Sequence, residues 1–208
     1  MIVAIDTSAA QCAVAVCAAD ATVLAHSAVP MARGHAEHLF PMLDDALRRA
    51  GGSHADLTRV AVCTGPGSFT GIRVGVSAAR GLALGRGVPV FGVTRFEALA
   101  AGVAGDIPVA VAIAARGGRY RQDFRPDGTA TGEMRFEAEG ETAPPPVGSR
   151  PVGDGWCPDI PGGDGLADPA AIARLAATRA PGALPVPVYL RVADADPPRE
   201  APPRVIDA

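Results

Sequence analysis

The sequence predicts an α/β fold, because short apolar strand-like runs alternate along it with segments of helical periodicity. Three apolar runs open the chain, at residues 2–6, 12–18 and 22–29, and their close spacing is typical of an antiparallel meander. A strongly amphipathic helix is then expected over 35–50, and a glycine-rich turn joins an apolar run at 60–63 to a second helix at 72–86. With 208 residues, 48% of them hydrophobic, the chain can bury a core and form one or two small domains.

The later elements are predicted from turn signals and helix caps. Thr94 and Glu97 fit a capping box, and Asp168 with Pro169 fits a helix start. In chain order we expect a strand at 88–93, a helix at 94–101, and strands at 107–115 and 119–125. Residues 141–165 should form proline- and glycine-rich loops with short strands. A helix at 168–179, a strand at 186–192, and a strap or frayed tail from 194 onward should follow.

Composition excludes several classes of protein. The net charge is −3 and no dense basic stripe is present, so tight RNA binding by this chain alone is not expected. The first apolar run stops at Asp6 without a basic start, and no run approaches the roughly 20 apolar residues of a membrane span. Cys12 and Cys17 have an odd spacing on one predicted strand and therefore point to opposite faces. We expect a cytoplasmic protein with buried free thiols.

The helix at 35–50 contains a histidine pair that invites a zinc interpretation. His35, Glu37 and His38 do not match the zinc-protease helix, in which the histidines are four apart and Glu follows the first. We therefore predict no metal site and expect these histidines to make caps or partner contacts. Pro41 predicts a kink or a late helix start. The apolar stripe comprises Ala36, Leu39, Phe40, Leu43, Ala46, Leu47 and Ala50.

The helix at 72–86 is apolar on two sides, which predicts burial against two neighbours. One face contains Ile72, Gly75, Val76, Ala79, Leu82 and Ala83. The other is a ridge of small side chains, Val74, Ala78, Gly81 and Gly85, that would let another helix approach closely. The second neighbour can come from this chain or from another subunit.

The glycine-rich turn before this helix is a candidate phosphate loop, since backbone amides at a helix start can hold an anion. A Walker loop is excluded because the chain contains no lysine. The Asp-Thr-Ser turn after the first strand either contacts a phosphate or a metal-bound nucleotide, or only hydrogen-bonds turn amides. The possible vestigial nucleotide loop comprises Asp6, Thr7, Ser8, Gly65, Gly67, Ser68, Thr70 and Gly71.

Several of these stretches together resemble one protein family. The matching pieces are Asp6-Thr7-Ser8 with the preceding Ile5, residues 33–38 with Pro41-Met42, the run from Gly65 to Arg73, residues 81–83, residues 91–94 and residues 187–191. They are similar to the TsaB (YeaZ) family, the dimerisation subunit of the bacterial machinery that makes N6-threonylcarbamoyladenosine in tRNA. The likeness covers the first hundred residues closely and the remainder sparsely.

The resemblance implies a two-lobed actin-like ATPase fold, each lobe a mixed sheet with flanking helices, and no independent catalysis. It implies an N-terminal lobe at 1–104, a smaller degenerate lobe at 105–193 and a tail at 194–208. It further implies that the first two helices bind the catalytic paralogue TsaD in a heterodimer and that the ATPase TsaE docks against the pair. ATP would be used by the complex and not bound independently by this chain, and tRNA would be contacted only through the complex. The resemblance also implies that isolated chains can form a homodimer.

The predicted partner-binding residues are His35, His38, Leu39, Met42, Leu43, Val74, Ala78, Gly81, Leu82 and Gly85. No catalytic residue is assigned. The chain departs from the family at Ala114, since Ala114-Ala115-Arg116 stands where the family commonly has Asp-Ala-Arg. His35 and His38 also do not reproduce the His-x-x-x-His metal motif of the paralogue. The alternatives are an actin-fold small-molecule kinase or ATPase using Asp6, Thr7 and the 65–71 loop, and, after it, a zinc peptidase.

Overall fold

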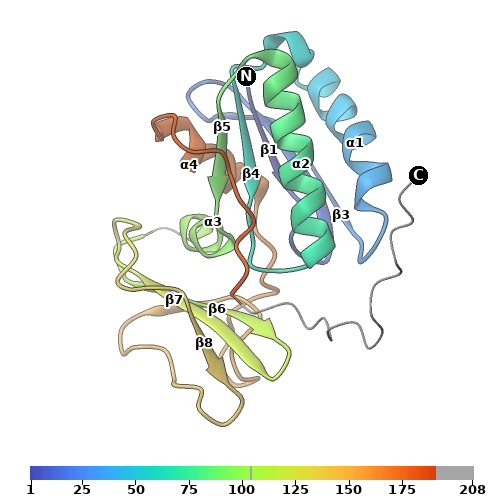
Figure 1. Cartoon of the computed structure of the whole chain (residues 1–208). Helices are drawn as coiled ribbons and strands as arrows, with labels where there is room; N and C mark the ends of the chain where they lie inside the picture. The colour runs from blue at the N-terminus through green and yellow to red at the C-terminus, as the bar shows by residue number, and fades with distance from the viewer. Residues whose placement is uncertain (104, 191–208) are drawn as a thin grey trace, which may run out of the picture.

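The chain folds around two mixed β-sheets, one above the other in Figure 1, with helices on the upper sheet. The computed structural model describes residues 1–103 and 105–190. The upper sheet has the strand order β3-β2-β1-β4-β5, in which β1 to β3 are antiparallel and β1, β4 and β5 are parallel. The lower sheet has the order β8-β7-β6-β9, with β6 and β9 parallel. The predicted fold class, α/β with two mixed sheets and flanking helices, is confirmed.

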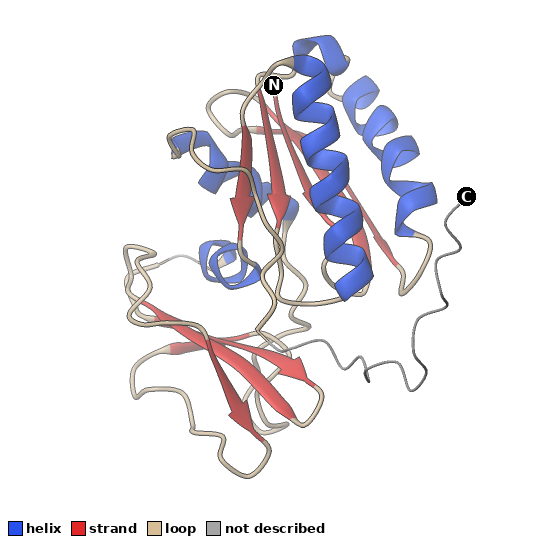
Figure 2. Ribbon diagram, in the orientation of Figure 1, coloured by secondary structure: helices blue, strands red, loops and turns tan. Residues whose placement is uncertain are grey.

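The upper sheet and its helices follow the sequence prediction closely (Figure 2). Their bounds are β1 Ile2–Asp6, β2 Gln11–Cys17, β3 Val23–Pro30, α1 His35–Arg49, β4 Arg59–Cys63, α2 Phe69–Arg86, β5 Val90–Val93, α3 Arg95–Gly102 and α4 Pro169–Thr178, with a short 3-10 turn η1 at His54–Asp56. Pro41 lies inside α1, which begins at His35, so the predicted late start is wrong.

The two faces of the upper sheet are covered by different helices. Residues of α1 and α2 share one buried cluster with one face of β1, β2 and β4, whereas residues of α3 and α4 share a second cluster with the other face and with β6 of the lower sheet. Cys12 belongs to the first cluster and Cys17 to the second, which confirms that they point to opposite faces. Both thiols are free and buried.

The lower sheet is formed by β6 Val109–Ala115, β7 Gly118–Phe124, β8 Arg135–Ala138 and β9 Arg150–Val152. Strands β6, β7 and the short β9 were expected, but β8 was not. The α4 helix packs on β1, β2 and β4 of the upper sheet, although its residues fall in the predicted second lobe. The predicted strand at 186–192 is wrong for its described part, since residues 186–190 form no strand. This segment crosses the sheet end as a strap, where Val188 N donates to Thr64 O at 2.8 Å.

The outer edge of the upper sheet is β3. Both Nη atoms of Arg49, on α1, donate to the carbonyl oxygen of His26 in this strand at 3.2 Å each. The same guanidinium is held by Asp45 one turn earlier on α1, at 2.9 Å. One carbonyl of β3 is therefore occupied by a charged side chain of the same chain.

Within residues 1–103 and 105–190, every helix is too short or too polar to cross a lipid bilayer. The predicted tail from 194 onward lies outside the described residues.

Candidate functional site

The glycine-rich loop between β4 and α2 is pressed against the turn that follows β1. A Cβ atom on Gly67 would lie 2.0 Å from Ser8 O, and one on Gly71 would lie 2.0 Å from Thr7 O. The backbone N of Ser68 donates to Ser8 O at 2.7 Å, and Thr7 Oγ1 donates to Gly71 O at 2.7 Å. Only glycine permits this approach. The loop is therefore joined to the turn by direct hydrogen bonds.

Asp6, the carboxylate at the end of β1, is fully buried and engaged by its own turn. Its Oδ1 accepts from Ser8 N at 2.8 Å and from Ser8 Oγ at 2.6 Å, and its Oδ2 accepts from Gln11 Nε2 at 3.3 Å. Ser8 Oγ also lies 3.2 Å from the thiol of Cys63. Burial raises the pKa of this thiol, and the nearby Asp6 adds to the rise. Of the two interpretations open for Asp6, the geometry matches turn bonding.

The eight residues of the possible nucleotide loop divide into two groups. Ser68 caps α2, its Oγ accepting from Gly71 N at 3.2 Å. Only Gly67, Ser68 and Thr70 are exposed, while Asp6, Thr7, Ser8, Gly65 and Gly71 are buried.

A cleft of about 490 Å³ lies between this loop and the lower sheet. Ser8, Gly67 and Ser68 line one wall, and residues 114–116 and Asp154 line the other. An actin-like ATPase fold implies Mg-ATP at such a place, but these residues do not fit that group. Asp6 is enclosed and Ala114 supplies no carboxylate. The two carboxylates that line the cleft each accept from a backbone amide, Asp154 from Ala114 N at 3.1 Å and Asp164 from Leu166 N at 3.0 Å. We derive no nucleotide chemistry from the cleft.

Arg95 joins the two walls of this cleft. Its backbone N donates to Gly65 O at 2.7 Å, in the glycine-rich loop. Its buried guanidinium donates to Gly165 O through Nε at 2.9 Å and Nη2 at 2.6 Å, and lies 3.7 Å from Asp154. The cleft is thus braced across its base by one side chain.

The predicted ridge of small side chains on α2 (Val74, Ala78, Gly81 and Gly85, the α2 ridge) is only partly covered by the described residues. Val74 and Ala78 are half-buried and pack against the α1–α2 core cluster, whereas Gly81 and Gly85 are exposed. A Cβ atom at either glycine would meet nothing within 4 Å. The opposite face of α2 is buried as predicted at Ile72, Gly75, Val76, Ala79 and Ala83, while Leu82 is half-buried. The C-terminal half of the ridge is therefore free to receive another helix.

Three of the partner-binding residues predicted on α1 need correction. His35, Leu39 and Leu43 are buried at 6%, 1% and 0% exposure, so their side chains face the core and cannot reach a partner. Met42 is half-buried and His38 is exposed. Both lie on the side of α1 that carries Arg49, which faces β3, because positions 38, 42, 45 and 49 follow one helical stripe. The prediction stays open for His38, Met42 and the α2 residues.

Three large apolar side chains that the prediction did not assign to the partner surface are exposed. Phe40 is 45% exposed on α1, and Phe69 and Leu84 are 46% and 85% exposed on α2. Phe40 was counted in the core stripe of α1, and a narrower stripe centred on Leu39, Leu43 and Ala46 would have left it outside. Leu84 was not placed on either apolar face of α2.

The histidines of α1 hydrogen-bond backbone carbonyls. His35 Nε2 donates to Gln11 O at 3.1 Å and His38 Nδ1 donates to Gly34 O at 2.9 Å. Within the described part of the chain, no group of three or more His, Cys, Asp and Glu side chains is placed to hold a metal ion.

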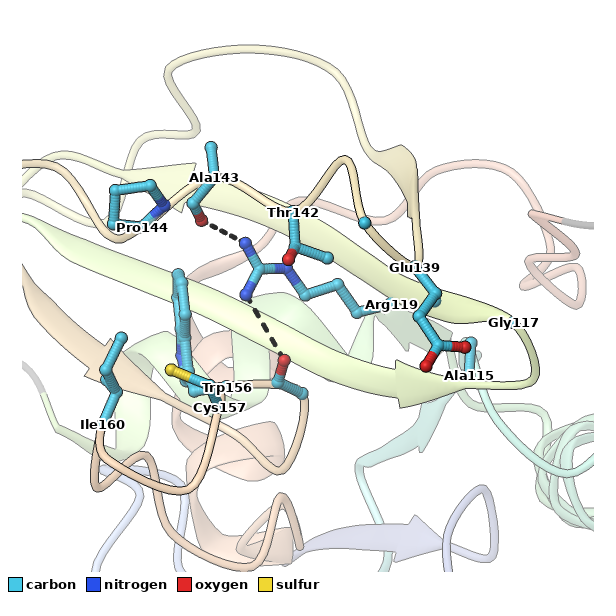
Figure 3. A pocket seen from close by; sticks show the side chains of 13 residues that line it. Ala115, Gly117, Arg119, Glu139, Thr142, Ala143, Pro144, Trp156, Cys157 and Ile160 are labelled. Atoms are coloured by element: carbon cyan, nitrogen blue, oxygen red, sulfur yellow. Dashed lines mark hydrogen bonds between the residues drawn. The ribbon is translucent and has the colours of Figure 1, made fainter.

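The lower lobe contains a second cavity, of about 620 Å³ (Figure 3). Arg119 runs along it with its guanidinium 4.5 Å from the centre of the Trp156 ring. Its Nε donates to Glu137 at 2.7 Å, and its Nη atoms donate to the carbonyls of Ala143 and Gly155. Burial acts to raise the pKa of Glu137, but Arg119 and two further arginines outweigh it and the net shift is downward. The cation in this cavity is already paired.

Comparison with known proteins connects this geometry to one family. The sequence model of TsaD, described as tRNA N6-adenosine threonylcarbamoyltransferase, matches residues 23–121. The chain is 43% identical over 101 residues to the tRNA threonylcarbamoyladenosine biosynthesis protein TsaB of Escherichia coli, which covers 49% of this chain and 43% of that protein. For TsaB of Bacillus subtilis the identity is 35% over 100 residues, covering 48% and 43%.

A solved structure matches over most of the length of the chain. YeaZ from Pseudomonas aeruginosa superposes with a TM-score of 0.73 and 26% identity, covering 90% of this chain and 98% of that one. The chain is similar in sequence to TsaB proteins over about half of its length, and in structure to YeaZ over most of it. The sequence matches to the curated TsaB proteins still span less than half of the length of each relative.

Proposed function

We propose that this chain is a non-catalytic subunit of the machinery that makes N6-threonylcarbamoyladenosine in tRNA, and that it binds and activates a TsaD-type catalytic paralogue. The observation that carries the proposal is the bare half of the α2 ridge, where Gly81 and Gly85 are exposed with open space above them. Of the four glycines in α2, Gly71 and Gly75 are pressed against Thr7 within this chain. Gly81 and Gly85 have no such contact, and each costs helix propensity of about 1 kcal/mol relative to alanine. A close helix–helix contact would explain why the helix keeps these two.

The exposed apolar side chains near the ridge support a partner on this face. Phe40 comes from α1 and Leu84 from α2, and both helices cover the same side of the upper sheet. Large apolar side chains exposed on the two helices of one layer are consistent with an interface on that layer. The partner would be a TsaD-type chain, in keeping with the TsaD model match at residues 23–121, which include both helices.

The interlobe cleft supports the non-catalytic part of the proposal. The carboxylate of β1 is enclosed and Ala114, near the end of β6, supplies none. The two carboxylates that line the cleft, Asp154 and Asp164, accept from backbone amides, which argues against a site built to hold Mg²⁺ with a nucleotide. In the proposed complex ATP is used by a TsaE-type ATPase docked against the pair, and tRNA is contacted through the assembly. Isolated chains can use the same ridge for a homodimer.

The test is to place a large charge on the bare ridge. Gly81→Arg puts a guanidinium into a contact that excludes water, which should weaken the heterodimer with the TsaD-type paralogue by about 100-fold or more. The monomer should remain folded, because a side chain at Gly81 meets nothing within 4 Å. Affinity is measured by calorimetry and complex formation by gel filtration.

Gly102→Arg is the matched control. Gly102 is an exposed helical glycine on α3, again with nothing within 4 Å of its Cβ position, and it belongs to the other face of the sheet. The control should bind like the unmodified chain. An intact complex with Gly81→Arg would refute the assignment of the interface.

The two alternatives predicted from the sequence have their own measurements. A kinase or ATPase of the same fold would bind Mg-ATP as an isolated chain, which calorimetry would detect. A zinc peptidase would contain one zinc ion per chain, which elemental analysis would detect. Either result would replace the scaffold proposal.

A further inference from the structure

An exposed cluster of two aromatic rings and one arginine lies where α2 begins. Phe69 is the first residue of α2, Arg73 follows one turn later, and Tyr189 comes from the strap 116 residues further along the chain. The guanidinium of Arg73 lies 3.8 Å from the centre of the Phe69 ring and 5.9 Å from that of Tyr189. The two rings are 5.1 Å apart.

The cluster holds the Arg73 guanidinium in place but does not use all of its hydrogen-bond donors. Its Nε donates to the Tyr189 hydroxyl at 2.9 Å, and the Phe69 ring supports one face of the guanidinium. In the described part of the chain, Nη1 and Nη2 have no hydrogen-bond partner, and no carboxylate pairs with Arg73. Phe69 and Tyr189 are 46% and 43% exposed, so the outer edge of the guanidinium is open to solvent. A planar guanidinium group held in this way loses little conformational entropy when it binds a carboxylate or phosphate.

The surroundings of the cluster select between these two anions. The other arginine on this side of α2, Arg80, is engaged with the carbonyl of Pro185 in the strap. Beyond it the surface is apolar, with Leu84, Leu184 and Val186 exposed at 85%, 62% and 63%. RNA binding relies on several neutralised phosphates and a basic surface, which one open guanidinium beside apolar side chains does not provide. A single carboxylate flanked by apolar residues is the better complement.

We propose that Arg73 is an anchor that binds an Asp or Glu side chain of an acidic, partly apolar protein segment, with Phe69 and Tyr189 holding its guanidinium in place. The proposal rests on the proposed function in taking this segment to belong to the partner that covers α2. Arg73 lies on the same helix as the bare ridge, nearer its N-terminus, where the helix dipole also favours a carboxylate. The two contacts would fix both the position and the direction of the partner along α2.

The first experiment measures the complex with the TsaD-type paralogue over a range of salt concentrations. Arg73→Ala should weaken binding by about 10- to 100-fold and flatten the dependence on salt. Arg73→Lys should recover little of the loss, because an ammonium cannot form the two parallel bonds of the fork. Tyr189→Phe, which removes only the tether to Nε, should give a smaller loss. Arg174→Ala is the control, an exposed arginine on α4 at the opposite face of the sheet.

The second experiment needs no partner. The Arg73 Nε–H resonance is followed by NMR while a capped five-residue peptide of alanine and leucine with one central glutamate is added, and then its glutamine counterpart. A shift with the glutamate peptide alone supports the proposal. No shift with either peptide, equal shifts with both, or a shift only with a tRNA anticodon stem-loop overturns it.

The two experiments separate the inference from the function on which it rests. If no complex with the paralogue forms, the proposed function fails and the peptide titration decides the role of Arg73. If the complex forms and Arg73→Ala binds as tightly as the unmodified chain at every salt concentration, the anchor is refuted while the subunit role stands.

Discussion

Two arginines in this molecule lie against aromatic rings, and they differ in almost everything else. Arg119 in the lower lobe is 5% exposed and stacks on Trp156. Its guanidinium donates hydrogen bonds to Glu137 and to two backbone carbonyls. Arg73 on α2 stacks on Phe69 at the surface, and among residues 1–103 and 105–190 its two Nη atoms have no hydrogen-bond partner. The same chemistry therefore serves stability where it is enclosed and paired, and is available for recognition where it is exposed.

The largest expected effect in this comparison is the loss of Arg119. Arg119→Ala leaves Glu137, which is 9% exposed, with only longer contacts to Arg121 at 3.5 Å and Arg135 at 3.2 Å. Breaking a buried pair from one side costs about 3–5 kcal/mol of unfolding free energy. Urea denaturation measures the loss, with the exposed Arg125→Ala as control. A loss below about 1 kcal/mol would mean that the two neighbouring arginines replace Arg119.

The next effect is an acid dependence of stability. The pKa of Glu137 is lower in the folded chain than its ordinary value of 4.5, so protonation favours the unfolded state. Its contribution is fully present above about pH 4.5 and is lost as the pH falls through the lower folded-state pKa. Glu137→Gln should reduce the slope of unfolding free energy against pH between about pH 5 and pH 3. An unchanged slope would assign the acid dependence to other carboxylates.

The smallest effect on stability is expected at the exposed cluster. Arg73→Ala removes a surface cation–π contact and one hydrogen bond, which together are worth about 0.5–1 kcal/mol. The thermal midpoint should therefore move by only a few degrees, in contrast to Arg119→Ala. A loss of unfolding free energy as large as that of Arg119→Ala would show that the cluster mainly stabilises the position of residues 186–190. The contrast between the two arginines would then disappear.

The fold was predictable where hydrophobic periodicity is strong. The five strands of the upper sheet, α1 and α2 were located from apolar runs, and α3 and α4 from their capping residues. Strand β8 was missed because it is short and mostly exposed, with Arg135 and Phe136 both facing solvent, so it has no apolar alternation. The sequence at 186–190 is typical of a strand, but the segment makes one backbone hydrogen bond, from Val188 N to Thr64 O, and forms no strand. Propensity alone does not reveal whether a strand-like segment finds a ladder partner.

The candidate site was less predictable because it depends on contacts between distant residues. Periodicity placed Gly81 and Gly85 on an outer ridge, but it could not show that Val74 and Ala78 pack against the core cluster shared with α1. The enclosure of Asp6 depends on Gln11 and on a loop sixty residues away, and the tether of Arg73 crosses 116 residues. Neither contact leaves a local signal in the sequence.

The contact between Arg49 and His26 O has a consequence for the molecule at high concentration. A row of free carbonyls along a terminal strand is a template on which further chains can add, one after another, into filaments. The Arg49 guanidinium occupies one of these carbonyls, that of His26, and is held in place by Asp45 of the same helix. A second strand could not use this carbonyl without displacing the arginine. The upper lobe thus has one charged obstacle to strand addition at the β3 edge.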